Sequence, residues 1–226
     1  MQRNIWEEEY KQGKLLSKSL KPQKDFFRLM KIIKKRGFDI EDKKVLDLGA
    51  GTGRNGIYLA ELGAAVTAME ISEVAIKMGK DEANKVGVQV DFINESIGGV
   101  FPMADNEFDL VLDLTASNSL DEKEREIYIK EVSRVLKSDG YFLVRTLTKE
   151  GDKNAKQLLK LFPAEETDTY ILPEINLKEH VWSRDDFKNF YSKGFEIIEM
   201  WSKEGYYRMN NRAYKRKYIL AVMSKK

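Results

Sequence analysis

The sequence predicts an α/β fold: a doubly wound, seven-stranded, mostly parallel sheet with helices on both faces and an antiparallel last strand. Apolar runs of strand length alternate with amphipathic runs of helix length, which is typical of a parallel sheet covered by helices. A glycine-rich turn joins the first such strand to a helix. Two strand-like runs close the chain with no room for a crossover helix between them, so we expect that pair to be antiparallel.

The first half of the chain carries clear helix signals. Gly37, Gly63 and Gly87 each follow an amphipathic run, where glycine favours a helix end. Ser72 precedes another such run and is expected to cap it. The expected elements are a helix at 23–36, a strand at 44–48, a helix at 54–62, a strand at 65–69, a helix at 72–86, strands at 88–93 and 108–113, a helix at 121–136 and a strand at 141–145.

The second half of the chain is less regular. We expect a helix near 154–162, an irregular segment through Trp182, and a helix capped by Ser183 with Asp186 in its first turn. The closing antiparallel strands are expected at 195–201 and 217–223.

Composition excludes several functions. The 226 residues include no cysteine and one histidine, so thiolate, iron–sulfur and multi-histidine metal sites are excluded, and we expect no metal. The longest apolar stretches fall far short of the ~20 residues of a membrane span. The first residues contain no apolar signal core, so we expect a cytoplasmic protein that does not associate with membranes. The net charge of +2 favours no class of partner.

The strongest functional signal is the turn after the first strand. Gly49, Gly51 and Gly53 allow positive φ and let a ligand approach the backbone. Glu70 ends the second strand 21 residues after Gly49, where a carboxylate can accept hydrogen bonds from ribose hydroxyls. The loop and this acid together predict a nucleoside site.

Two cofactors compete for this site. Residues 51–56 also match the dinucleotide pattern Gly-x-Gly-x-x-Gly, which favours NAD. Asp47 argues against NAD, because it precedes the turn where a pyrophosphate would bind. A carboxylate there suits a cationic amino acid instead, and S-adenosylmethionine (SAM) combines such a group with a ribose.

The sequence resembles the class I, Rossmann-like SAM-dependent methyltransferases, particularly those that act on small molecules. The resemblance rests on residues 45–53, Glu70, the run 108–113 and the stretch 133–144, and covers roughly 43–226. It implies one methyltransferase domain over 1–226, with a helical cap at 1–42, a SAM-binding half at 43–147, and an acceptor lid with a C-terminal hairpin at 148–226.

The resemblance also implies a set of site residues. The loop glycines would line the methionine part of SAM, Glu70 would hold the ribose, and the residues after the third strand would border adenine. The end of the fourth strand would lie near the sulfonium. The cofactor-binding residues expected on this basis are Asp47, Gly49, Ala50, Gly51, Gly53, Glu70, Ile71, Asn94, Glu95, Ser96, Asp113 and Leu114.

The acceptor is less well defined by the sequence. We expect methyl transfer from SAM to an oxygen or nitrogen atom of a small molecule, releasing S-adenosylhomocysteine, with His180 as the catalytic base where one is needed. Arg145 ends the fifth strand and either faces the same crevice or forms a buried ion pair. The alternative acceptor is RNA or protein, because 11–36 and 201–218 are basic. A monomer or a homodimer is expected.

Overall fold

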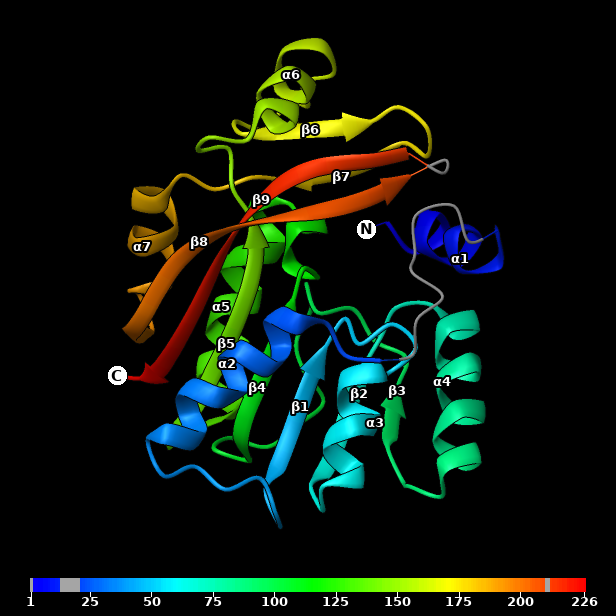
Figure 1. Ribbon diagram of the computed structural model, residues 1–226, viewed down its shortest axis with the longest axis vertical. Helices are drawn as coiled ribbons and strands as arrows, with labels where there is room; N and C mark the ends of the chain where they lie inside the picture. Colours follow the sequence, from blue (N-terminus) through cyan, green and yellow to red (C-terminus); the bar gives the residue numbers. More distant parts are fainter. Residues whose placement is uncertain (1, 13–20, 210–211) are drawn as a thin grey trace.

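The structure is a computed structural model that describes residues 2–12, 21–209 and 212–226. Its main feature is a seven-stranded sheet with the order β3-β2-β1-β4-β5-β9-β8 (Figure 1). The strands are β1 (Lys44–Leu48), β2 (Ala65–Met69), β3 (Asp91–Ile93), β4 (Phe108–Leu114), β5 (Leu136–Leu147), β8 (Phe195–Met209) and β9 (Arg212–Lys225). β1 to β5 are parallel, and β9 runs antiparallel to both of its neighbours. The predicted fold class is therefore confirmed.

Helices cover both faces because the strands bury side chains on both sides. α2 (Lys24–Lys35) and α3 (Arg54–Glu61) pack on one face, in a core that includes Leu110 and Leu112. α5 (Glu122–Val135) and α7 (Arg184–Tyr191) pack on the other face, against Val111. α4 (Glu73–Val86) follows β2 and packs on β3. Consecutive residues of β4 thus belong to opposite cores.

Two predicted helix caps form as expected. The Ser72 hydroxyl accepts a hydrogen bond from Ala75 N at the start of α4. The Ser183 hydroxyl accepts one from Asp186 N at the start of α7. These local bonds satisfy amide groups that have no partner inside the helix.

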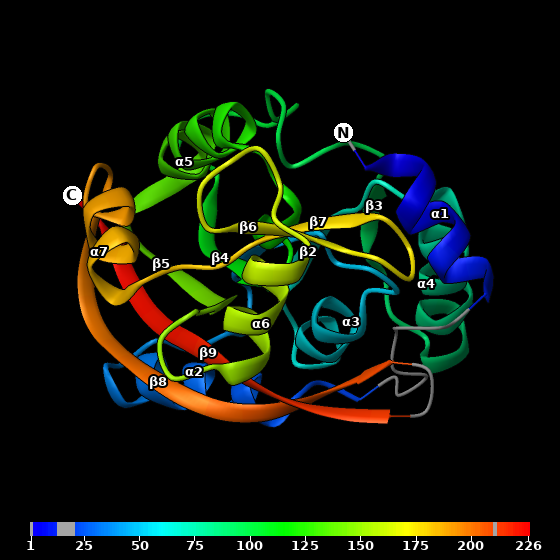
Figure 2. The same cartoon turned by 90° about the horizontal axis from the view of Figure 1, so that it is seen from above.

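The segment before Trp182 is not irregular, and that prediction was wrong. After α6 (Lys153–Leu161), the chain forms a two-stranded antiparallel sheet from β6 (Thr169–Leu172) and β7 (Leu177–His180). The turn between them contains Asn176 at φ 57°, a conformation that asparagine tolerates. Because this position is not a glycine, the sequence did not indicate the turn. We call residues 153–180 the lid, because α6, β6 and β7 lie over the edge where the parallel strands end (Figures 1 and 2).

A buried polar network anchors the lid to β9. The Arg216 guanidinium donates to Asp152 Oδ2 at 3.0 Å and to the Tyr170 hydroxyl at 2.8 Å. Tyr170 in turn donates to Glu179 Oε2 at 2.6 Å. All four side chains are buried, so loss of one partner would leave an uncompensated buried charge.

The final hairpin is longer than predicted. β8 and β9 pair from Phe195 with Lys225 out to Met209 with Arg212, whereas β5 pairs with β9 only from Tyr218 to Ser224. The outer part of the hairpin therefore extends beyond the main sheet. Its polar sequence lacks the apolar alternation that identified the inner part.

The N-terminal region contributes α1 (Arg3–Gln12), which contacts α4. Among the described residues, no helix is both long and apolar enough to cross a bilayer.

Candidate functional site

The glycine turn between β1 and α3 forms a backbone cradle at the edge where the parallel strands end. Gly49, Gly51 and Gly53 have φ values of 59°, 60° and 73°, which other residues adopt only with strain. A Cβ on Gly49 would collide with Ala116, and one on Gly51 would collide with the Tyr10 hydroxyl. The glycines are therefore required by conformation and by space. Ala50 lies between them, with its N–H donating to the Met69 carbonyl at 3.0 Å.

Glu70 joins this cradle to α4. Its carboxylate accepts from Gly51 N at 2.8 Å and from Ser72 N at 2.9 Å. The side chain is 5% exposed, and burial raises its pKa while the two N–H groups oppose that shift. A carboxylate oxygen has a second lone pair, so Glu70 can still accept from a ligand hydroxyl.

Asp47 lies beneath the cradle. Its Oδ2 accepts from Gly56 N at 3.2 Å, and the residue is 1% exposed. Burial raises the pKa of this carboxyl to about 7, although the Gly56 N–H and the Arg54 guanidinium oppose the shift. Asp47 thus changes charge near neutral pH beneath the loop.

Asn94 and Ile71 lie together beside Glu70. The Asn94 amide donates to the carbonyls of Glu70 at 3.1 Å and Ile71 at 3.0 Å. Arg3 of α1 donates to Asn94 Oδ1 at 2.8 Å and to the Ile71 carbonyl at 2.9 Å. A hollow of 420 Å³ between β3 and α4 includes Asn94 and Phe92 in its lining. Asn94 therefore lies both beside Glu70 and in the wall of this hollow.

The four remaining predicted residues differ in their surroundings. Glu95 is exposed and forms no hydrogen bond or ion pair with the described residues, whereas the Ser96 hydroxyl accepts from Gly98 N at 3.1 Å. Asp113 is fully buried, accepting from the Tyr128 hydroxyl at 2.6 Å and from Ala116 N at 2.8 Å. Leu114, at the end of β4, is only partly buried.

Sequence reasoning missed most of the contacts that α1, which lies against α4 (Figure 2), makes with the cradle and its neighbours. Glu7 accepts a hydrogen bond from the Ser72 hydroxyl, and Tyr10 reaches Gly51. Burial, followed by the nearby Glu70 carboxylate, raises the Tyr10 pKa well above its usual range, so the phenol is neutral. These residues are more than 40 positions from their partners, and no local pattern marks such contacts.

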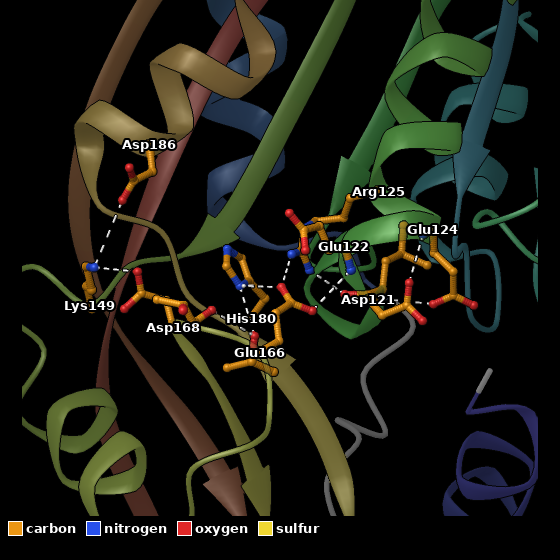
Figure 3. A network of polar contacts seen from close by, with 12 residues as sticks. Asp121, Glu122, Glu124, Arg125, Lys149, Glu166, Asp168, His180 and Asp186 are labelled. Carbon is orange, nitrogen blue, oxygen red and sulfur yellow. Dashed lines mark hydrogen bonds and ion pairs between the residues drawn. The ribbon is translucent and has the colours of Figure 1, made fainter.

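His180 lies in the lid, within the polar network shown in Figure 3. Its Nδ1 is 3.0 Å from the Thr169 hydroxyl and 3.4 Å from Glu166 Oε1, and its ring packs edge-on against Trp182. Burial lowers the His180 pKa, although Glu166 opposes the shift, so the ring is neutral at pH 7. Nε2 forms no hydrogen bond with the described residues.

Glu166 connects this histidine to α5. It forms an ion pair with Arg125 and accepts from Glu122 N at 3.1 Å. Burial raises the Glu166 pKa, but the hydrogen bonds from His180 and Arg125 outweigh it and lower the value to about 2. A cavity of 690 Å³ lies between α1, the start of α5 and the lid, with Glu166 and Thr169 in its wall. His180 contacts both of these residues but does not itself line the cavity.

The donor set fits a nucleoside cofactor better than a metal. No group of three or more histidine, aspartate and glutamate side chains is arranged for a metal ion within 2–12, 21–209 and 212–226. The cradle, by contrast, offers open backbone at Gly49 to Gly53, a ribose acceptor in Glu70 and a buried acid in Asp47. These groups match the ribose and the cationic amino acid of SAM.

Comparisons with known proteins agree with this geometry. Residues 46–144 match the family model of a methyltransferase domain. The chain is 36% identical over 106 residues to sarcosine/dimethylglycine N-methyltransferase of Halorhodospira halochloris, covering 45% of this chain. It is 30% identical over 119 residues to ribosomal protein L11 methyltransferase of Desulforamulus reducens, covering 52% of this chain. The chain spans 37% of the length of each of these relatives.

A solved structure extends the match to most of the chain. A SAM-dependent methyltransferase from Methanosarcina mazei superposes with a TM-score of 0.73 at 26% identity, covering 85% of this chain and 96% of that one. The family match includes the last three residues of β1, the glycine cradle, Glu70 and β4, which form the site. Residues 46–144 thus match a methyltransferase domain, and the chain as a whole has the class I, Rossmann-like fold of SAM-dependent methyltransferases.

Proposed function

We propose that the protein transfers the methyl group of SAM to an oxygen or nitrogen atom of a small molecule and releases S-adenosylhomocysteine. The observation that carries the proposal is the bond between Glu70 and Gly51 N, which fixes a ribose acceptor against the glycine cradle. SAM supplies a methyl group on a sulfonium, and this electrophile requires positioning more than covalent help.

Different residues of the chain hold different parts of SAM. The cradle holds the methionine part, Glu70 accepts from the ribose hydroxyls, and Asn94, Ile71 and the Ser96 backbone border adenine. Asp47 acts through its charge rather than by contact, because it is buried beneath the loop. Leu114 and the backbone of Asp113 flank the sulfonium, while the Asp113 carboxylate holds the chain after β4 in place.

The lid and the cavity beside it support a small molecule as the methyl acceptor. The lid lies above the strand ends, and β7 packs on the short 3-10 helix Ser117–Ser119 that follows β4. The cavity of 690 Å³ beside the lid falls within the usual size range of small-molecule sites. The relative from Halorhodospira halochloris is named for sarcosine and dimethylglycine, which are small molecules.

His180 is proposed as the general base that removes a proton when the group to be methylated starts as a hydroxyl or an ammonium. Its ring is neutral, as a base must be, and its Nδ1 is fixed by Thr169 and Glu166. The unpaired Nε2 is the nitrogen that takes the proton.

Asp47 predicts a pH dependence of cofactor binding. Because its pKa is about 7, the carboxyl is neutral at pH 6 and ionised at pH 8. We expect the affinity for the cationic SAM to rise about fivefold across this range, which is the part of a roughly tenfold total effect that a pKa shift of about one unit on binding produces between pH 6 and pH 8. S-adenosylhomocysteine lacks the sulfonium charge and should respond less. Calorimetry at pH 6, 7 and 8 measures both ligands.

The matched variant is Asp47→Asn, which is neutral at every pH. It should bind SAM with little pH dependence, and the exposed Asp39→Asn should behave as wild type. An Asp47→Asn protein that retains the full pH dependence would show that another group is responsible.

Replacing His180 tests its proposed role. His180→Ala should lower kcat by about 10²–10⁴-fold, because general-base catalysis contributes that much. The affinity for SAM should stay within a few-fold, since His180 is in the lid and not in the cradle. Thr169→Val keeps the imidazole ring but removes the hydrogen bond to its Nδ1, so it should lower kcat by less than His180→Ala does. Wild-type turnover by His180→Ala would remove His180 from the mechanism.

A macromolecular acceptor is the second candidate. The relative from Desulforamulus reducens is named for a ribosomal protein, and the segment 11–36 is basic. Lys14 and Lys18, which contribute to that charge, lie outside the described residues.

Salt dependence separates RNA from a small molecule. Contact with Z phosphates of a single strand gives log K falling with log[salt] at a slope of about −0.7Z. We expect only weak binding of bulk tRNA at moderate ionic strength, measured by fluorescence anisotropy between 50 and 300 mM KCl. Sub-micromolar binding with a steep slope would favour the RNA acceptor instead.

A further inference from the structure

Asn118 is a buried side chain of which only one half is used within the protein. It lies in the short 3-10 helix Ser117–Ser119 that follows β4, and it is 2% exposed. Its Oδ1 accepts from Leu147 N at 3.3 Å and from the Thr146 hydroxyl, both at the end of β5. Within the described residues, its Nδ2 forms no hydrogen bond. The oxygen of the side chain thus has a structural role, whereas the NH2 group has none.

The partners of Asn118 fix the orientation of its amide. A backbone N–H can only donate, so the atom that faces Leu147 must be the amide oxygen and not the nitrogen. The nitrogen is not one of the fully enclosed polar atoms that lack a partner, so the small accessible area of Asn118 includes it. A donor held in such a place without a partner costs free energy, which a bound oxygen atom would recover.

The segment that carries Asn118 is held in a strained conformation. Thr115 has a φ of 77°, which a β-branched residue rarely adopts. The buried Asp113 carboxylate accepts from Ala116 N at 2.8 Å and from Ser117 N at 3.3 Å, and these bonds fix the backbone after β4. Strain of this kind is typical of segments that position functional groups.

Asn118 lies between the cradle and the lid. Ala116, two residues earlier, packs so closely on the cradle that a Cβ on Gly49 would collide with it. On the lid side, β7, the strand that ends in His180, packs on the 3-10 helix. The next residue, Ser119, lines the cavity of 690 Å³. Asn118 is therefore placed between the elements proposed to hold the methyl donor and the general base.

We propose that Asn118 is a specificity-determining residue whose side-chain NH2 group donates a hydrogen bond to a carbonyl or carboxylate oxygen of the methyl acceptor. This inference rests on the proposed function and defines its substrate class. The hydrogen bond fixes one end of the acceptor, so that the nucleophilic atom is aligned with the methyl group. An acceptor that offers only donors at this point, such as an ammonium, is disfavoured because the NH2 group then stays unpaired.

The test measures the binding of small probes to the complex with S-adenosylhomocysteine, by NMR titration at pH 8. Acetophenone carries a neutral carbonyl and benzoate a carboxylate, each on a phenyl ring. α-Methylstyrene is the matched probe, because a CH2 group takes the place of the carbonyl oxygen. For at least one of the two oxygen-containing probes, the affinity relative to that of α-methylstyrene should fall about fivefold or more in Asn118→Asp and in Asn118→Leu, as expected for the loss of one hydrogen bond. The probe whose relative affinity falls shows whether a carbonyl or a carboxylate is recognised.

The two variants separate the donor from the structural role of the side chain. Asn118→Asp keeps an oxygen for Thr146 and Leu147, so it should fold as the wild type does, but a second oxygen replaces the NH2 group. Asn118→Leu removes the donor without adding a charge. The affinity for S-adenosylhomocysteine should stay within a few-fold in both. Two controls should retain the relative affinities of the wild type: Asn189→Asp at an exposed position of α7, and Thr146→Val, which removes only a hydrogen bond at Oδ1.

Three results would contradict the inference. The first is that neither acetophenone nor benzoate binds the wild-type complex. The second is that the relative affinities of both probes are unchanged in Asn118→Asp. The third is that Asn118→Asp weakens the binding of S-adenosylhomocysteine about tenfold or more, because Asn118 would then contact the cofactor. A wild type that does not bind S-adenosylhomocysteine at all would instead refute the proposed function.

Discussion

The hydrogen bonds of the Glu70 carboxylate organise the site. One oxygen accepts from Gly51 N in the turn after β1, and the other accepts from Ser72 N at the start of α4. A carboxylate is costly to bury without partners, so the side chain and the turn constrain each other. Because the glycines of the turn hold conformations that side chains would strain, the loop stays open on the ligand side.

The lid and α1 are held in place by different sets of ion pairs and hydrogen bonds. The lid is attached to β9 through Arg216, whose partners are all buried, and to α5 through the pair of Glu166 with Arg125. α1 is attached through Arg3 and Glu7 to polar groups beside Glu70. The network that holds the lid is buried and therefore costly to break.

Much of the fold and the cofactor side was predictable because their signals are local. The strand, the turn glycines and Glu70 follow one another within a short stretch, and caps such as Ser72 depend on adjacent residues. The acceptor side was less predictable. The hairpin of β6 and β7 turns at Asn176, and the pairing of Arg3 with Asn94 or of Arg145 with Asp25 joins distant positions. Burial also changed roles: Asp113, expected at the sulfonium, uses its carboxylate inside the protein.

Binding of S-adenosylhomocysteine and NAD, measured by calorimetry on the wild type, Glu70→Ala and the exposed control Glu61→Ala, tests the central claim most directly. The account predicts that S-adenosylhomocysteine binds one to one and NAD does not. It also predicts that Glu70→Ala weakens the former about tenfold or more, since a hydrogen bond to a charged group contributes roughly 1.5–3 kcal/mol. Glu61→Ala should bind as the wild type does. Binding of NAD without S-adenosylhomocysteine, or unchanged affinity in a folded Glu70→Ala protein, would contradict the account.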